Sequence, residues 1–406
     1  MRSLCWLFCL LFPLAVEAEL LWEYQSGGPV TAPPLITNKG LFLAAGQAVH
    51  HLDKRGALLN RLPLDEDVRS TPVIHQGLLL VHGKGGLFAF SADGSQLWHH
   101  ASQDGPLMVA GETWGWGEGV YADPWAWYRS GVAVKDNTAF YSDSGGTYAV
   151  ELKTGKRLWH RDTGQTHTTP VVGDDAVFAA SWNNSLYALS PANGEILWRF
   201  DADLPAGQFS GWAGWQGLNL TPTLNGKAIY LGSRGTYLYK LAASSGKEIW
   251  RVKHASTWIG SPAMVFDNTL YYGLSDGTAL VGQALDSGNL THLVQSPHLI
   301  FAPPVQVDGR IYFATLSGEL FEYMPGTGQR RRLYQTRASA DHYPRHVKAG
   351  GGPNYLPADP QLSPHQATVK QVQVMLREMD SILSLTTDGQ QLYLGTATGR
   401  LLAIRI

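Results

Sequence analysis

Cysteine is nearly absent from this sequence of 406 residues, which contains two. Both of them, Cys5 and Cys9, lie close to the start of the chain. The remainder therefore cannot form a disulfide, and it offers no thiolate to a metal ion or to a catalytic mechanism. We expect the folded protein to derive its stability from packing.

The first 18 residues have the composition of a secretory signal peptide. Arg2 provides a positive charge, an apolar run extends from Leu4 to Val16, and Val16-Glu17-Ala18 resembles a cleavage site. The apolar run of about a dozen residues is shorter than the roughly 20 that span a bilayer. We expect cleavage before Glu19, export of residues 19–406 and, because both cysteines precede that site, no lipid anchor.

An excess of positive charge is also missing. The formal net charge is −2 and the isoelectric point is near 6.7, which argues against a nucleic-acid partner. Glycine, with 45 residues, and tryptophan, with 14, are by contrast abundant. This composition is typical of many short strands joined by tight turns.

A unit of roughly 40 residues is repeated along the chain. One copy contains Thr71-Pro72, apolar runs at 78–81 and 87–90 with Gly85-Gly86 between them, and Leu97-Trp98. The order recurs, complete or weakened, at 32–62, 139–159, 169–198, 221–250, 261–293, 302–333 and 382–406. Each unit has up to four apolar runs separated by turn residues, which indicates a four-stranded antiparallel blade. We therefore predict an all-β fold, an eight-bladed β-propeller.

In four units a tryptophan follows a turn glycine by four positions. These residues are Trp98, Trp159, Trp198 and Trp250. We interpret them as structural side chains that pack between neighbouring blades, because large aromatic residues dominate the cores of such folds. Other units have Asn60, His292 and Arg332 at this position.

The last unit ends at Ile406 after three strands, so its fourth strand is missing from the C-terminal sequence. The segment Leu20 to Tyr24 resembles Ile196 to Phe200 in character and places Trp22 where the structural tryptophan is expected. We predict that this N-terminal strand pairs with residues 401–406 and closes the ring.

The elements Pro72-Val73, Leu186-Tyr187-Ala188-Leu189 and Gly194-x-x-Leu197-Trp198 resemble those of the PQQ-repeat propellers. This family includes quinoprotein dehydrogenases and BamB-like subunits of the outer-membrane protein assembly machinery. The quinoprotein branch implies PQQ held by calcium and, in alcohol dehydrogenases, a disulfide between adjacent cysteines. Residues 19–406 contain no cysteine and no evident set of calcium ligands, so we expect no cofactor. The BamB-like branch implies a noncatalytic periplasmic scaffold that binds a protein.

Three insertions, near 103–129, 203–217 and 336–380, interrupt the repeats. Each one links a fourth strand to the next blade, so we expect all three on one face of the ring. The first two carry the candidate binding residues Trp114, Trp116, Trp125, Trp127, Trp212 and Trp215. These side chains either pin the loops to the propeller or present flat faces to a sugar ring, a peptide aromatic residue or a quinone.

The third insertion begins with basic residues and ends with an apolar periodic segment. Its candidate partner-binding residues are Arg337, His342, Arg345 and His346. The arginine side chains can bind a carboxylate or phosphate group through two hydrogen bonds. The two histidines are four positions apart, but Pro344 should interrupt a helix between them, so we expect no metal site. Helical spacing over 366–379 predicts an amphipathic helix that lies on the propeller.

Together these features favour a monomeric periplasmic scaffold that binds a protein partner through its inserted face, in outer-membrane or envelope protein assembly. The alternative is a ligand-binding or enzymatic propeller that acts on a glycan or on PQQ through the tryptophan-rich loops. No catalytic residues can be assigned from spacing, because propeller sites are assembled from distant loops.

Overall fold

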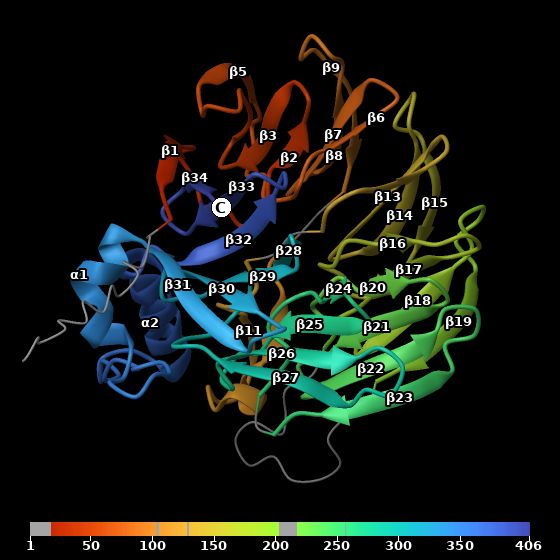
Figure 1. Cartoon of the computed structure of the whole chain (residues 1–406). Helices are drawn as coiled ribbons and strands as arrows, with labels where there is room; N and C mark the ends of the chain where they lie inside the picture. The colour runs from red at the N-terminus through yellow and green to blue at the C-terminus, as the bar shows by residue number, and fades with distance from the viewer. Residues whose placement is uncertain (1–17, 103–104, 128–129, 203–216, 256) are drawn as a thin grey trace, which may run out of the picture.

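A computed structural model describes residues 18–102, 105–127, 130–202, 217–255 and 257–406. Their strands form eight four-stranded antiparallel sheets arranged in a ring, with two helices on one side (Figure 1). The predicted eight-bladed propeller is therefore confirmed.

Within each blade the strands follow one another from the centre of the ring to its rim. Blades 1 to 4 comprise β2 (Leu35–Thr37), β3 (Gly40–Ala45), β4 (Ala48–Leu52), β5 (Leu58–Pro63); β6 (Val73–His75), β7 (Leu78–Gly83), β8 (Gly86–Phe90), β9 (Gln96–Ala101); β12 (Ala133–Lys135), β13 (Thr138–Asp143), β14 (Gly146–Glu151), β15 (Arg157–Arg161); and β16 (Val171–Val172), β17 (Val177–Ala180), β18 (Ser185–Leu189), β19 (Ile196–Asp201).

The second half of the ring repeats this arrangement. Blades 5 to 8 comprise β20 (Thr223–Asn225), β21 (Ala228–Gly232), β22 (Tyr237–Ala242), β23 (Glu248–Lys253); β24 (Met264–Phe266), β25 (Thr269–Gly273), β26 (Ala279–Ala284), β27 (Leu290–Gln295); β28 (Val305–Val307), β29 (Arg310–Ala314), β30 (Glu319–Met324), β31 (Gln329–Gln335); and β32 (Ile382–Thr387), β33 (Gln391–Thr396), β34 (Arg400–Arg405) with β1 (Leu20–Gln25).

The second and third strands are buried on both faces, whereas the fourth strand is buried on one. All five residues of β18 are buried, and β19 alternates between exposed and partly buried positions. This difference follows from the sequence, because the middle strands are continuous apolar runs and the outer ones alternate with polar residues. The apolar clusters lie between neighbouring blades. One of them, for example, contains Tyr230 of blade 5 and Tyr272 of blade 6.

Each predicted structural tryptophan packs on the turn between the third and fourth strands of the next blade. The Trp98 indole lies against Gly155, where a Cβ atom would approach Cε3 to 2.5 Å. Its Nε1 donates to the Leu152 carbonyl at 2.9 Å. Corresponding contacts join Trp22 to Gly56, Trp159 to Gly194, Trp198 to Gly246 and Trp250 to Gly288. Each of these indoles therefore lies at a junction between two neighbouring blades.

The N-terminal strand closes the ring, as predicted. β1 is antiparallel to β34, and Trp22 is opposite Ala403. Trp22 Nε1 donates to the Lys54 carbonyl at 3.0 Å, which joins blade 8 to blade 1. The main-chain N–H of Ser26 also donates to the Gly399 carbonyl at 2.9 Å.

The insertions add three helices and a short hairpin to the propeller. The first contains β10 (Met108–Ala110), the 3₁₀ helix η1 (Gly111–Trp114) and β11 (Val120–Ala122). The third contains α1 (Arg337–His346) and α2 (Pro364–Glu378), of which α2 corresponds to the predicted amphipathic helix. None of the helices in the described ranges is long and apolar enough to cross a membrane.

Candidate binding site on the inserted face

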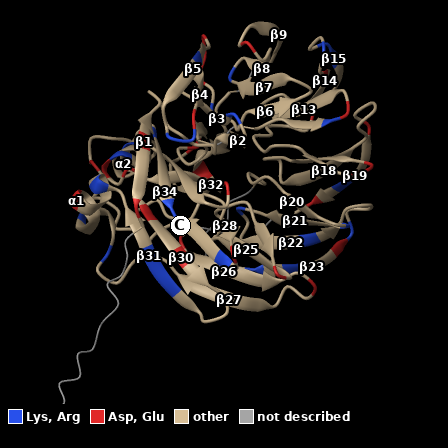
Figure 2. Ribbon diagram, turned by 45° about the horizontal axis from the view of Figure 1, so that its top comes forward, with Lys and Arg blue, Asp and Glu red and all other residues tan. Residues whose placement is uncertain are grey.

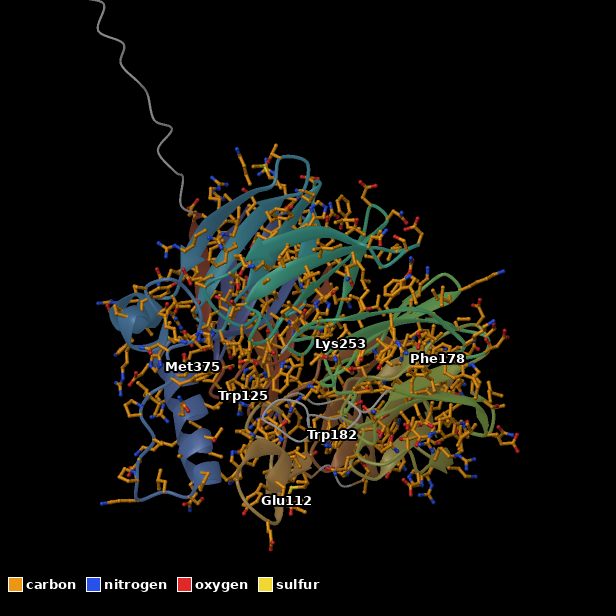
Figure 3. All side chains as sticks on the ribbon, turned by 90° about the horizontal axis from the view of Figure 1, so that it is seen from below. Glu112, Trp125, Phe178, Trp182, Lys253 and Met375 are labelled. Carbon is orange, nitrogen blue, oxygen red and sulfur yellow. The ribbon has the colours of Figure 1, made fainter. Side chains whose placement is uncertain are left out.

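The first and third insertions pack against each other on one face of the ring. The main-chain carbonyl of Ala122 in β11 lies 2.9 Å from His365 Nε2 in α2, and Trp116 Nε1 donates to Thr368 Oγ1 at 3.1 Å. Figure 3 shows Met375 on α2 close to Trp125, and both belong to one apolar cluster. The expectation of a shared face is met for these two insertions, whereas residues 203–216 lie outside the described ranges.

Two of the candidate tryptophans are anchors. Trp125 and Trp127 are 7% and 8% exposed, and both rings contact Phe301 in the link between blades 6 and 7. Trp114 and Trp116 stack on each other at 4.7 Å, with Trp116 buried and Trp114 half-buried. The candidates Trp212 and Trp215 lie outside the described residues.

An ion pair that the sequence did not suggest fixes the first insertion to the propeller. Arg234, in the turn between β21 and β22, contacts Asp123 at 2.6 Å, and the side chains are 2% and 0% exposed. Its guanidinium also lies 4.3 Å from the ring centre of Trp258, 4.8 Å from that of Trp182 and 5.7 Å from that of Trp114. Arginine suits such a position, because its flat, weakly hydrated group stacks on aromatic faces.

The helix α1 contains Pro344, so the expected interruption between His342 and His346 is wrong. The proline lies in the last turn of the helix, where its missing N–H removes a single main-chain hydrogen bond. The two histidines nevertheless have different partners. His342 Nδ1 lies 2.9 Å from the Ala338 carbonyl, and His346 Nε2 lies 2.6 Å from Glu378 Oε2.

Two of the four basic candidates, Arg345 and His346, have the same acidic partner, Glu378. Arg345 pairs with Glu378 at 2.8 Å, whereas Arg337 is exposed. The arginines of β31, part of which is coloured as basic in Figure 2, are partly neutralised by buried carboxylates. Arg331 pairs with Glu322, and Arg332 pairs with Glu319, each at 3.0 Å. These pairs weaken the case for an anion site formed by these residues.

The helix α2 packs on blades 7 and 8 at this face. Val372, Met375 and the following Met379 are buried against Leu316 and Leu383 of blades 7 and 8. A cavity of about 650 Å³ remains between α2 and the first insertion, and it is lined in part by Trp127, Leu376 and Leu383. Leu383 also lines a second cavity of about 280 Å³, whose described lining comes from blades 1 to 4 and 6 to 8 and the links that precede them.

A smaller cavity of about 190 Å³ lies where the first insertion meets the third. Indole rings form much of its wall, supplied by Trp114, Trp116, Trp125 and Trp258. The remaining described lining residues are Asp276, His298, Leu299, His346, Pro353, Asn354, Tyr355, Thr368, Gln371, Val372 and Met375. Among all of them, Tyr355 alone is exposed, at 46%.

The polar groups of this cavity differ in how well they are paired. The Tyr355 hydroxyl donates to Asp276 Oδ1 at 3.2 Å. By contrast, both ring nitrogens of His298 and the Nε2 of Gln371 are buried without a hydrogen-bond partner among the described residues. Burial, and secondly the electrostatic effect of nearby His346, lower the pKa of His298 to about 3, so its ring is neutral.

Four residues of this region could not be identified from the repeat pattern: Trp258, His298, Gln371 and Arg234. A signal was available for one of them, because Trp258 and Trp182 lie outside the Gly-x-x-x-Trp register. The described residues contain no group of three histidine, cysteine or acidic side chains placed to hold a metal ion.

The blades, their tryptophan contacts and the N-terminal closure define an eight-bladed propeller of the PQQ-repeat type. The family described as outer membrane protein assembly factor BamB matches residues 15–122, 113–213 and 210–406. The chain belongs to this family.

Individual relatives are distant. The chain is 25% identical over 286 residues to the outer membrane protein assembly factor BamB of Moranella endobia, covering 66% of this chain and 64% of that protein. It is 23% identical over 201 residues to the factor of the same name from Escherichia coli, covering 44% and 45%. These matches span less than two thirds of each relative.

Solved structures agree on the fold. The designed protein Ika8 has a TM-score of 0.64 at 14% identity, covering 96% of this chain and 99% of that one. Sqt1 from Saccharomyces cerevisiae has the same TM-score at 11% identity, covering 97% and 100%. At such identities the likeness is one of architecture.

Proposed function

We propose that this protein is a noncatalytic periplasmic scaffold that binds a component of the outer-membrane protein assembly machinery through its inserted face. The observation that carries the proposal is the composite surface formed by the first and third insertions on a propeller of the BamB family. The ring holds this surface rigid, and long ordered loops on a rigid scaffold commonly carry binding functions.

The composition of the surface suits a protein partner. The hairpin β10–η1–β11 presents exposed Glu112, Glu118 and Val120, and the segment between α1 and α2 presents Tyr355. Aromatic and apolar residues within a polar rim are typical of the anchors of protein interfaces. We further propose that the exported chain begins at Glu19, acts as a monomer without a lipid anchor and needs no cofactor.

Charge reversal tests which face binds the partner. Arg337 and Lys348 are exposed on the third insertion, whereas Lys153 and Lys247 are exposed in turns on the opposite face. We expect R337E/K348E to reduce co-purification of the outer-membrane assembly component from crosslinked envelopes. The matched variant K153E/K247E changes the net charge equally and should leave co-purification unchanged.

Point variants are preferable to removal of residues 336–380, because Val372 and Met379 belong to the core. Equal co-purification by the two double variants, or recovery of no assembly component by the unchanged protein, would contradict the proposal. Cell fractionation with N-terminal sequencing tests the export step, for which we expect a periplasmic chain that starts at Glu19.

A further inference from the structure

The 190 Å³ cavity has the size and the walls of a small-molecule site. Drug-sized ligands occupy pockets of about 300–1,000 Å³, so this cavity suits a ligand of about one ring. The stacked pair Trp114 and Trp116 and the rings of Trp125 and Trp258 provide flat apolar faces. Two insertions and the links around blade 6 contribute to it, so the site exists only in the folded propeller.

The buried polar groups indicate which ligand is complementary. His298 is fully buried and neutral, so one ring nitrogen is a donor and the other an acceptor. Neither has a partner among the described residues, and Gln371 Nε2 is a further buried donor without one. Leaving such groups buried and unpaired is unfavourable, so a ligand that pairs with them gains affinity. A hydroxyl group both donates and accepts, and therefore matches this set.

Other ligand classes fit less well. An anion would meet the Asp276 carboxylate, and the described lining residues include no lysine or arginine. A cation would approach the guanidinium of Arg234, which already lies over Trp114 and Trp258. A purely aromatic ligand would leave His298 and Gln371 unpaired. A neutral ring with apolar faces and several hydroxyl groups satisfies both the walls and the polar atoms.

We propose that this cavity binds one neutral pyranose ring, either a free monosaccharide or the terminal unit of a glycan. The C–H faces of the sugar stack on the indoles, and its hydroxyls bond to His298, Gln371 and Asp276. Tyr355, the exposed lining residue, lies at the entrance, where a longer glycan would continue into solvent. This site shares Tyr355 with the proposed protein-binding surface, but sugar binding does not require a protein partner.

Titration of the full chain with sugars tests the site. The probes are glucose, galactose, mannose and N-acetylglucosamine, each also as a short oligosaccharide, with tryptophan fluorescence and calorimetry as readouts. We expect saturable quenching by at least one probe. Equal affinity for the monosaccharide and its oligomer indicates a free-sugar site, whereas tighter binding of the oligomer indicates a glycan end, and either result supports the proposal.

Variants distinguish binding from a structural role. H298L should weaken the sugar about tenfold or more and, because it removes unpaired buried polar atoms, should leave the melting temperature without sugar unchanged or higher. The matched variant H254L removes a half-buried histidine that contacts the Tyr272 hydroxyl at 2.8 Å outside the cavity. It should lower the melting temperature and preserve sugar affinity.

Three results would overturn the proposal: no saturable binding of any sugar, sugar binding that H298L leaves intact, or binding of PQQ or indole in place of sugars. A fall in the melting temperature of H298L without sugar, combined with no sugar binding by the unchanged protein, would assign His298 a structural role.

Discussion

The eight junctions between blades fall into two groups. At five of them a tryptophan packs on a turn glycine of the next blade, and at three of them Asn60, His292 or Arg332 occupies the tryptophan position. The junction from blade 6 to blade 7 instead has His292 Nδ1 2.8 Å from the Tyr323 hydroxyl. At the first junction the Leu62 side chain fills the space beside Gly94.

The junctions without tryptophan on either side of blade 7 lie beneath the third insertion. One apolar cluster joins that insertion to Leu299 of the link before blade 7, to Leu316 within blade 7 and to Leu383 of blade 8. The insertion therefore supplies packing across blades that lack the repeated contact. The repeated tryptophan–glycine contact therefore stabilises five of the junctions. The third insertion, which also forms part of the candidate site, stabilises the junctions beside blade 7.

Deletion of residues 19–26 should have the largest effect on stability, because it removes a whole strand together with the Trp22 contact on Gly56. The substitution W22A alone should cost about 3 kcal/mol. Thermal unfolding followed by circular dichroism measures both changes. L197A, at a side chain 52% exposed on β19, is the control and should change stability by less than about 0.5 kcal/mol. An unchanged melt after the deletion would disprove closure by β1.

Arg234 tests how the inserted face is attached. R234M leaves Asp123 buried without its partner, which should cost about 3–5 kcal/mol in urea unfolding. The double variant R234M/D123L removes both charges and should recover part of this loss. R199M breaks a pair in which both side chains are about half exposed, and should cost less than about 1 kcal/mol. If R234M and R199M lowered the free energy of unfolding equally, the Arg234–Asp123 pair would not be the buried attachment of the first insertion.

Two glycines with almost the same main-chain conformation isolate the tryptophan contact. Gly155 and Gly328 have φ of +68° and +70°. A Cβ atom at Gly155 would collide with Trp98, whereas one at Gly328 would have nothing within 4 Å. G155A should therefore be less stable than G328A by about 1–3 kcal/mol. Equal free energies of unfolding would mean that positive φ, and not the tryptophan, requires glycine there.

The stability of the protein should also depend on pH. Burial lowers the pKa of His254 to about 4 and that of His298, which also faces His346 and Asp276, to about 3. The unfolded chain therefore binds more protons between these values and the ordinary histidine value of 6.5, so stability falls as pH decreases through that window. Burial raises the pKa of Asp143 and Asp276, which acts in the opposite direction near pH 4.

We expect a loss of up to about 3 kcal/mol between pH 6.5 and 5, about half of it from each histidine, measured by urea unfolding at each pH. The H298L variant should reduce the dependence of the free energy of unfolding on pH. Substitution of the exposed His99 by glutamine should change this dependence less. Stability that is constant or rises as pH decreases over this range would contradict the account.

The fold could be predicted from the sequence because each blade is a local unit whose turns and apolar runs are repeated. The closing strand could also be predicted, since Trp22 matches a register set by four other copies. The site could not be predicted in full. Trp258, His298 and Asp276 lie in different links and turns around blade 6, and the packing of the third insertion across this face brings them together with α2.

The error at Pro344 has a similar cause. A proline is unfavourable within an isolated helix, but in α1 it occupies the last turn, and neighbouring side chains hold the helix. Tyr343 donates to Glu319 Oε2 at 3.0 Å, and Thr336 Oγ1 donates to the Met379 carbonyl at 2.7 Å. These tertiary contacts are not visible in a local pattern.

Hydrogen exchange of the purified protein with and without the outer-membrane assembly component tests the central claim, that the inserted face binds a partner. The account predicts protection in residues 108–122 and 348–368, with little change in the turns around Lys153 and Lys247 on the opposite face. Protection confined to those turns, or to the rims of the outer strands, would contradict it.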